Sequence, residues 1–182
     1  MTATHAAFLR GVNLGAQRKT GSAQLRACFE GIGLDEVQTF RTSGNVVLGA
    51  RRESAAKLTG RLEAALRESF GFEVKVFLRN ARQVRAIAEH NPFPPAAVKR
   101  SEGKLQVALL SKAPPAAARD AVLAMATDED LLAFEERELY WLPNGRMTDS
   151  RLNLRAVEKL TDAWTMRTKA TIELLAAKFF GA

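Results

Sequence analysis

Cysteine and histidine are scarce in this chain, with one cysteine and two histidines among 182 residues. A lone cysteine cannot close an internal disulfide, which agrees with a reducing compartment. Cys28 shares a helical stripe with Leu25 and Phe29, so we expect it to be buried and inert. His5 and His90 have no cysteine or carboxylate at ligand spacing. The sequence therefore predicts no metal and no cofactor.

Long apolar runs are also missing from the sequence. No stretch reaches the length that a membrane-spanning helix needs, and no basic segment followed by an apolar one marks a secretory signal at the N-terminus. We therefore expect a cytoplasmic protein without a membrane partner. The content of 47% hydrophobic and 26% charged residues is typical of a globular chain, which excludes the disordered, collagen-like and disulfide-scaffold classes.

The net charge of +7 is unevenly distributed along the chain. Residues 1–91 carry 14 Lys and Arg against 8 Asp and Glu, while residues 92–182 carry 13 against 12. A basic half attracts nucleic acid or phosphorylated metabolites, but a surplus of this size also occurs on the solvated helices of proteins that bind neither. Charge leaves both readings open, and nothing in the sequence indicates an oligomeric state.

The first half of the chain alternates strand and helix patterns. Period-two and helical spacings of apolar residues predict elements at 5–10, 22–32, 37–41, 45–48, 54–70 and 74–79. Their order is β-α-β-β-α-β, which is the order of a ferredoxin-like unit with both helices on one face of an antiparallel sheet.

The second half begins after a short helix at 81–90 and a proline-rich break at 91–95. A strand at 105–110, a helix opened by Pro114 and Pro115, strands at 131–135 and 139–142, and helices at 151–161 and 168–180 follow. We therefore predict an α+β fold of two consecutive ferredoxin-like halves, the second lacking its closing strand. The expected domains are 1–90, a ferredoxin-like subdomain with an extra helix, and 91–182, a C-terminal α+β subdomain.

Four segments of the chain match the pattern of one known family. They are Arg10-Gly11-Val12-Asn13-Leu14-Gly15 with Lys19 close behind, Ser43-Gly44-Asn45-Val46-Val47, Asn91-Pro92-Phe93, and Leu139-Tyr140-Trp141-Leu142-Pro143 followed by Ser150-Arg151-Leu152. In this order they resemble the bacterial domain of unknown function family 1697, an uncharacterised family. The resemblance implies two α+β subdomains related to the ferredoxin-like arrangement, and it implies no reaction.

The chain departs from that family near its C-terminus. Members usually carry Arg-Asn-Trp before the last helix, whereas Arg167 is followed here by Thr168 and Lys169. If the aromatic residue completes a site or an interface in relatives, this chain has lost or altered that feature.

The glycine-rich loop after the first strand is not a nucleotide phosphate loop. Arg18 and Asn13 stand where that motif requires glycine, and the G-x-G-x-x-G spacing of dinucleotide-binding folds is absent. The carboxylates at 128–130 and 135–138 read as solvated loop charge rather than as a catalytic pair. No catalytic residue is assigned, and the sequence leaves open whether the protein is an enzyme.

A candidate anion site follows from topology. Strands one and two of a β-α-β-β-α-β unit run parallel, so the end of strand one, the start of the first helix and the turn after strand two share one end of the sheet. Backbone amides, glycines and cations there suit phosphate or carboxylate. The candidate ligand-binding residues are Arg10, Gly11, Asn13, Gly15, Lys19, Arg41, Ser43, Gly44 and Asn45. The alternative is that these residues only form turns, cap backbone groups and pair internally.

A second, weaker cluster consists of Ser150, Arg151 and Arg167, for which helix capping and surface charge are favoured over ligand binding. The function predicted first is binding of a small phosphorylated or carboxylated ligand. One alternative is weak nucleic-acid binding without sequence specificity, since Phe40 and Phe77 lie on suitable strands but the aromatic-rich strand signature is absent. Another is an interaction protein without catalysis.

Overall fold

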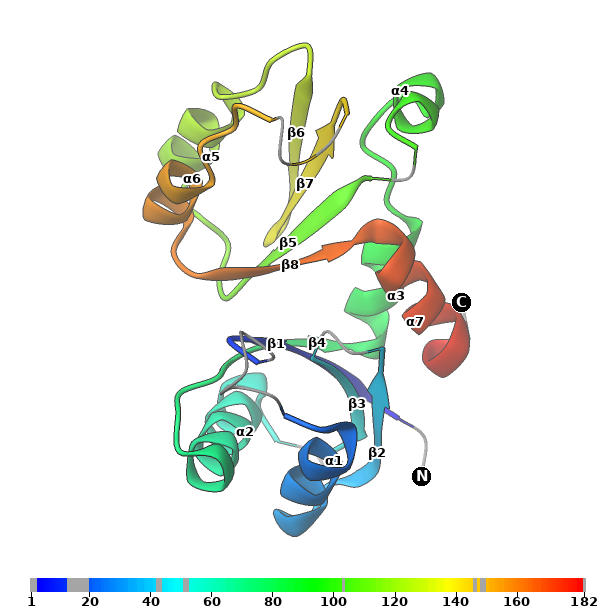
Figure 1. The fold of residues 1–182 in the computed structure, drawn as a ribbon, viewed down its shortest axis with the longest axis vertical. Helices are drawn as coiled ribbons and strands as arrows, with labels where there is room; N and C mark the ends of the chain where they lie inside the picture. The colour runs from blue at the N-terminus through cyan, green and yellow to red at the C-terminus, as the bar shows by residue number, and fades with distance from the viewer. Residues whose placement is uncertain are drawn as a thin grey trace. The chain divides into compact units, whose positions relative to one another are not determined.

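The computed structural model describes residues 3–12, 20–41, 44–50, 53–102, 104–145, 147 and 150–181. The chain forms two compact units (Figure 1). Unit 1 comprises Met1–Arg85 and Leu175–Ala182, and unit 2 comprises Ala86–Leu174. Both boundaries fall inside helices, so the last helix contributes residues to each unit. The division into domains 1–90 and 91–182 remains a sequence-based prediction.

Unit 1 contains the element order expected from the sequence. Its elements are β1 (His5–Arg10), α1 (Ser22–Gly31), β2 (Asp35–Phe40), β3 (Asn45–Gly49), α2 (Ala55–Phe70), β4 (Lys75–Asn80) and most of α3 (Ala81–Glu89). The four strands form a sheet in the order β2-β3-β1-β4, and all neighbours are antiparallel. Helices α1 and α2 cover one face of this sheet (Figure 1).

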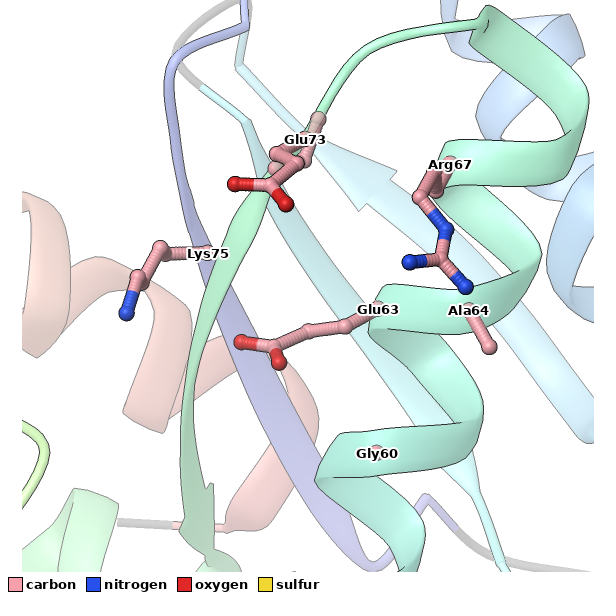
Figure 2. A pocket seen from close by; sticks show the side chains of 7 residues that line it. Gly60, Glu63, Ala64, Arg67, Glu73 and Lys75 are labelled. Carbon is pink, nitrogen blue, oxygen red and sulfur yellow. The ribbon is translucent and has the colours of Figure 1, made fainter.

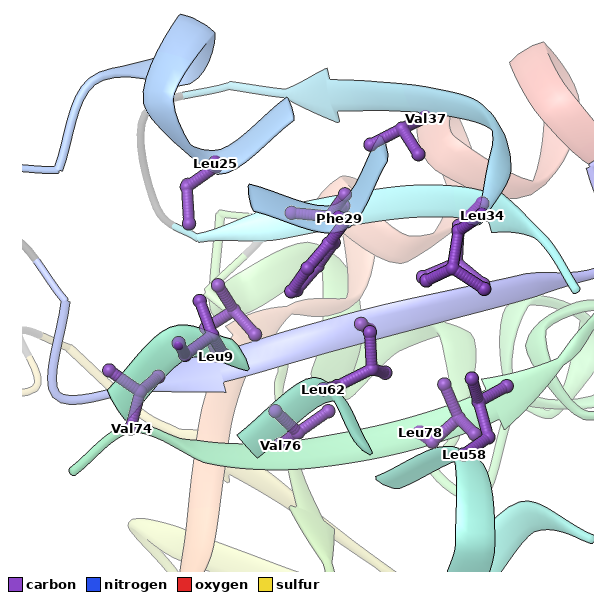
Figure 3. Packing of buried hydrophobic residues seen from close by; sticks show 14 of the residues in the cluster. Leu9, Leu25, Phe29, Leu34, Val37, Leu58, Leu62, Val74, Val76 and Leu78 are labelled. Carbon is purple, nitrogen blue, oxygen red and sulfur yellow. The ribbon is translucent and has the colours of Figure 1, made fainter. Parts of the chain in front are cut away.

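Helix α2 illustrates how local signals set the unit 1 core. It begins where the Ser54 hydroxyl accepts a hydrogen bond from the Lys57 amide at 3.3 Å, and it ends at Gly71, which has a left-handed backbone. Leu58 and Leu62 are 1% and 0% exposed and pack against the sheet (Figure 3). Burial of each such leucine contributes about 1.5–3 kcal/mol.

Cys28 is only partly buried, which differs from the expectation. It lies against the rim of the apolar cluster rather than inside it, and the Ser69 hydroxyl donates a hydrogen bond to its sulfur at 3.3 Å. Leu25 and Phe29 lie on the face of α1 that is buried in the core, whereas Cys28 lies at the side of that face.

Unit 2 contains a second four-stranded antiparallel sheet, in the order β6-β7-β5-β8. Its remaining elements follow the end of α3 along the chain. They are α4 (Pro95–Arg100), β5 (Gln106–Leu110), α5 (Ala116–Leu123), β6 (Asp130–Glu135), β7 (Glu138–Pro143), α6 (Leu154–Thr161), β8 (Trp164–Thr168) and the first half of α7 (Lys169–Phe180). Helices α5 and α6 lie together on one face of the sheet (Figure 1).

The prediction that the second half lacks its closing strand is wrong. Strand β8 pairs antiparallel with β5, in a register from Gln106 opposite Thr168 to Leu110 opposite Trp164. Trp164 and Met166 pack on the helix-covered core, whereas Arg167 occupies a buried position on the other face. The sequence pattern did not indicate this strand because its buried positions hold polar residues, so it contains no apolar run. It also passes directly into α7, with no turn residue to mark its end.

Candidate functional site

Two of the three segments that the sequence placed at one end of the unit 1 sheet lie side by side there. The Leu9 amide donates a hydrogen bond to the Gly44 carbonyl at 2.8 Å, which joins the end of β1 to the turn between β2 and β3. Across β1 on its other side, Arg10 stands opposite Lys75 at the start of β4. Of the candidate residues, Asn13, Gly15, Lys19 and Ser43 lie outside the described part of the chain.

Gly44 and Asn45 hold the turn in place. Gly44 has φ of 70°, and a Cβ atom added to it would lie 2.5 Å from Cγ2 of Val12. Asn45 is 1% exposed, and its side-chain amide donates to the Phe40 carbonyl at 3.0 Å. The structure therefore supplies a structural reason for both residues, which the sequence offered as the alternative to ligand binding.

Arg10 and Lys75 form a like-charged pair across neighbouring strands. The neighbouring pair on the same two strands is Leu9 opposite Val76, and both of these residues belong to the core cluster under the helices. Because side chains alternate along strands, Arg10 and Lys75 point to the opposite face. Directly opposed residues have Cβ atoms about 4.5–5.5 Å apart, and like charges at that separation are unfavourable. An anion that contacts both side chains would relieve this repulsion.

A hollow of about 280 Å³ lies beside the start of β4 (Figure 2). It is lined by Gly60, Glu63, Ala64, Arg67, Glu73, Val74 and Lys75. Glu63 reaches from α2 toward β4, and its carboxylate accepts a hydrogen bond from the Val76 amide at 3.0 Å. Lys75 points away from α2 in the same view. With Lys75 directed away, the lining carries two carboxylates against one guanidinium, that of Arg67, so an anion is better placed on the other side of β4, between Lys75 and Arg10.

The remaining cation of the first cluster, Arg41, stands at the end of β2 and is exposed. Its backbone is left-handed, with φ of 58°. This conformation costs a residue with a Cβ atom about 1–2 kcal/mol. The guanidinium carbon lies 5.7 Å from the centroid of the Phe40 ring. The Arg41 side chain thus lies near the Phe40 ring. Arg41 directly follows β2, the edge strand opposite to β4, on which Lys75 lies.

The second cluster is divided by the structure. The Ser150 hydroxyl donates to a carboxylate oxygen of Asp130 at 2.8 Å, and the indole nitrogen of Trp141 donates to the same oxygen at 2.6 Å. Asp130 lies on β6, whereas Arg167 lies on β8 at the other edge of the sheet, three strand positions away. Arg151 is exposed. Ser150 and Arg167 therefore do not meet in one site.

Arg167 is nearly buried, with 8% of its surface exposed. Its guanidinium donates to the Thr165 hydroxyl at 2.9 Å and to the Met166 carbonyl at 2.7 Å. Burial lowers the pKa of Arg167 to about 10, so the side chain remains a cation at neutral pH.

Sequence reasoning missed the role of Lys169, which stands at the position where the chain departs from the family pattern. Lys169 is 4% exposed, and its ammonium donates to the Ala88 carbonyl at 2.8 Å, the Asn91 side chain at 3.2 Å and the Glu173 carboxylate at 2.8 Å. The link joins the start of α7 to the Asn91 segment within unit 2. The i,i+4 spacing of Lys169 and Glu173 was the signal for part of it.

A further arrangement that sequence reasoning missed surrounds Phe40. The ring of Phe179, from the last turn of α7, meets Phe40 edge to face with centroids 5.8 Å apart. The ammonium of Lys178 lies 5.9 Å from the Phe40 centroid and 5.1 Å from that of Phe179. We call Phe40, Arg41, Lys178 and Phe179 the basic–aromatic cluster; all four belong to unit 1.

Among the residues that the structure describes, no group of three or more histidine, cysteine, aspartate or glutamate side chains could hold a metal ion. In the same described ranges, no helix is long and apolar enough to cross a membrane.

The family model described as protein of unknown function (DUF1697) matches residues 1–140. The chain belongs to this family. A solved structure, that of the conserved bacterial protein SP0830 from Streptococcus pneumoniae, is similar with a TM-score of 0.72 and 20% identity, covering 98% of this chain and 100% of that one. At this identity the likeness concerns the fold alone. No curated protein matched the chain.

Proposed function

We propose that this member of the family binds a small anion, a phosphorylated or carboxylated metabolite, at the end of the unit 1 sheet. The observation that carries the proposal is the pair of opposed cations, Arg10 and Lys75, at the end of the β1–β4 ladder. Each charge-assisted hydrogen bond from such a cation to an anion contributes about 1.5–3 kcal/mol. We also propose a cytoplasmic location, consistent with the single cysteine.

The charge distribution over the folded units supports an anionic ligand for unit 1. Unit 1 contains 15 Lys and Arg against 7 Asp and Glu, a net charge of +8, whereas unit 2 contains 12 against 13, a net charge of −1. The field of a unit with this excess raises the local concentration of anions around it.

The proposal includes a ferredoxin-like arrangement for each unit. The sheet orders β2-β3-β1-β4 and β6-β7-β5-β8 place corresponding strands in corresponding positions, and in unit 1 both helices follow the β-α-β-β-α-β order. This arrangement supports the site, because it brings the end of β1, the β2–β3 turn and the start of β4 to one end of the sheet.

Thermal unfolding in the presence of phosphate, sulfate or carboxylates tests this proposal. The double variant Arg10→Gln with Lys75→Gln should lose the rise in melting temperature that these anions give the wild-type protein over chloride at equal ionic strength. A ligand at about 100 times its Kd contributes about 2.7 kcal/mol. The loss of this anion response should exceed any change in the stability of the anion-free protein, because an anion stabilises only the state that it binds.

The matched control is Arg26→Gln with Lys57→Gln. It removes two exposed cations from the helices of the same unit, so it changes the net charge equally but leaves the strand ends intact. Equal anion responses in the two double variants would refute a defined site. A loss of stability in the Arg10 and Lys75 variant that is the same with and without anion would assign these residues to the fold alone.

A further inference from the structure

We infer that the basic–aromatic cluster of unit 1 binds single-stranded nucleic acid. The inference rests on Phe40, Arg41, Lys178 and Phe179 and is independent of the anion site at Arg10 and Lys75. Two segments far apart in sequence build it, the end of β2 and the last turn of α7.

The cluster is anchored to unit 1 on both sides. The side-chain amide of Asn45 donates to the Phe40 carbonyl at 3.0 Å, which fixes the end of β2. A guanidinium nitrogen of Arg85 donates to the Phe180 carbonyl at 3.0 Å, which fixes the end of α7. The two rings are thus presented by the folded unit, and little conformational entropy is lost when a ligand contacts them.

The exposure of Phe40 distinguishes it from the other aromatic residues in its row. Phe40, Asn45, Phe8 and Phe77 stand opposite one another across β2, β3, β1 and β4. Phe8 and Phe77 are 0% and 2% exposed, so they offer no ring to a ligand. Phe40 and Phe179 are both only partly buried. Unstacked bases bind such rings without regard to their identity.

Arg41 and Lys178 add the second requirement, positive charge beside the rings. Both are exposed, both lie within 6 Å of the Phe40 centroid, and within the described part of the chain neither pairs with a carboxylate. Two like charges around one ring repel each other, and the phosphates on either side of a stacked base would compensate both.

The combination favours single strands over other polyanions. In a duplex the base faces are stacked on one another, so they cannot reach Phe40 or Phe179. An acidic peptide would neutralise Arg41 and Lys178 but would leave the rings without partners. Because the cluster contains no hydrogen-bonding pattern directed at base edges, binding should be tolerant of sequence and sensitive to salt.

Fluorescence anisotropy with labelled oligothymidine and oligoadenosine of about 20 nucleotides measures this binding at low salt. Removal of one ring by Phe40→Leu or Phe179→Leu should weaken binding about 5-fold to 150-fold, the equivalent of about 1–3 kcal/mol per stacked base. Lys178→Gln should lower the slope of log K against log salt by about 0.7, the value for one phosphate on a single strand. Phe40→Tyr, which keeps the ring, should bind as wild type does.

Thermal unfolding of each variant distinguishes a loss of binding from a loss of folding. The double variant Arg41→Gln with Lys178→Gln removes both positive charges of the cluster and leaves both rings in place. The charge-matched control is again Arg26→Gln with Lys57→Gln, which should bind far better than the cluster variants. No binding by the wild-type protein, equal binding of duplex and single strand, or competition by polyglutamate as strong as by an oligonucleotide would each overturn the inference. Loss of the anion response in the Arg10 and Lys75 variant with retained binding here would separate the two sites.

Discussion

At the scale of single residues, the glycines of unit 1 divide into those that the fold requires and those that it tolerates. Gly44 has φ of 70°, and an added Cβ would lie 2.5 Å from Cγ2 of Val12 and 3.2 Å from Cβ of Leu9. Gly60 lies inside α2, where an added Cβ meets nothing within 4 Å. The same substitution should therefore have opposite effects at the two positions.

We expect Gly44→Ala to lower the free energy of unfolding by about 2–5 kcal/mol, the sum of the left-handed strain and the overpacking against Val12. Gly60→Ala should raise it by about 0.5–1 kcal/mol, because alanine is the better helix former. Urea unfolding measures both. A neutral Gly44→Ala variant would show that the turn can shift without cost and would contradict the close packing described here.

His5 predicts a pH dependence of stability at the residue scale. Burial lowers the pKa of His5 from its ordinary value of 6.5, with the Glu53 carboxylate opposing the shift in part. The folded state then binds fewer protons than the unfolded state, so the contribution of neutral His5 is fully present above pH 6.5 and is lost as the pH falls below it.

The free energy of unfolding should accordingly decrease from pH 7.5 to pH 5.5, and His5→Gln should reduce that decrease. Urea unfolding across this range provides the measurement. At pH 7.5 and above, the slopes of the two proteins should coincide, because His5 is neutral in both states there. A variant with an unchanged slope over the lower range would assign the pH dependence to other groups.

At the scale of secondary structure, the junction between β8 and α7 depends on one buried ammonium group. Lys169 donates to the Ala88 carbonyl, Asn91 and Glu173, and it is 4% exposed. Lys169→Met should destabilise the protein by about 1.5–3 kcal/mol, because it removes the charged hydrogen bonds of a buried ammonium, while its acceptors on Asn91 and Glu173 are exposed and can turn to water. Urea unfolding measures the loss.

Lys159→Met on α6 is the control for this change, since Lys159 is exposed in the same unit and its loss should alter stability by less than about 0.5 kcal/mol. A double-mutant cycle with Asn91→Ala should give non-additive losses, because both side chains belong to one hydrogen-bonded link. Additive losses would mean that Lys169 and Asn91 act separately.

At the scale of the whole molecule, folding concentrates the positive charge. The net charge is +8 on unit 1 and −1 on unit 2. A flexible polyanion without bases, such as a heparin fragment, should therefore contact unit 1 alone. Hydrogen exchange with mass spectrometry should show protection of unit 1 peptides, weakening as salt shortens the Debye length to about 10 Å at 0.1 M. Protection of the β5–β7 region would contradict this expectation.

The sequence by itself determined the order of the helices and strands of unit 1. Leu58, Leu62 and Leu66 repeat at helical spacing, and Gly71 ends their helix, so local periodicity and capping were sufficient. From that element order the end of β1 was expected beside the β2–β3 turn, where the hydrogen bond from the Leu9 amide to the Gly44 carbonyl joins them.

Tertiary structure decided what local pattern does not encode. Strand β8 has Arg167 at a buried position, so only pairing with β5 defines it as a strand. The like-charged pair of Arg10 and Lys75 depends on the register of β1 and β4. The basic–aromatic cluster exists because α7 returns Lys178 and Phe179 to unit 1, next to Phe40. Contacts between distant segments follow from packing of the whole chain, and periodicity reports only on neighbours within one element.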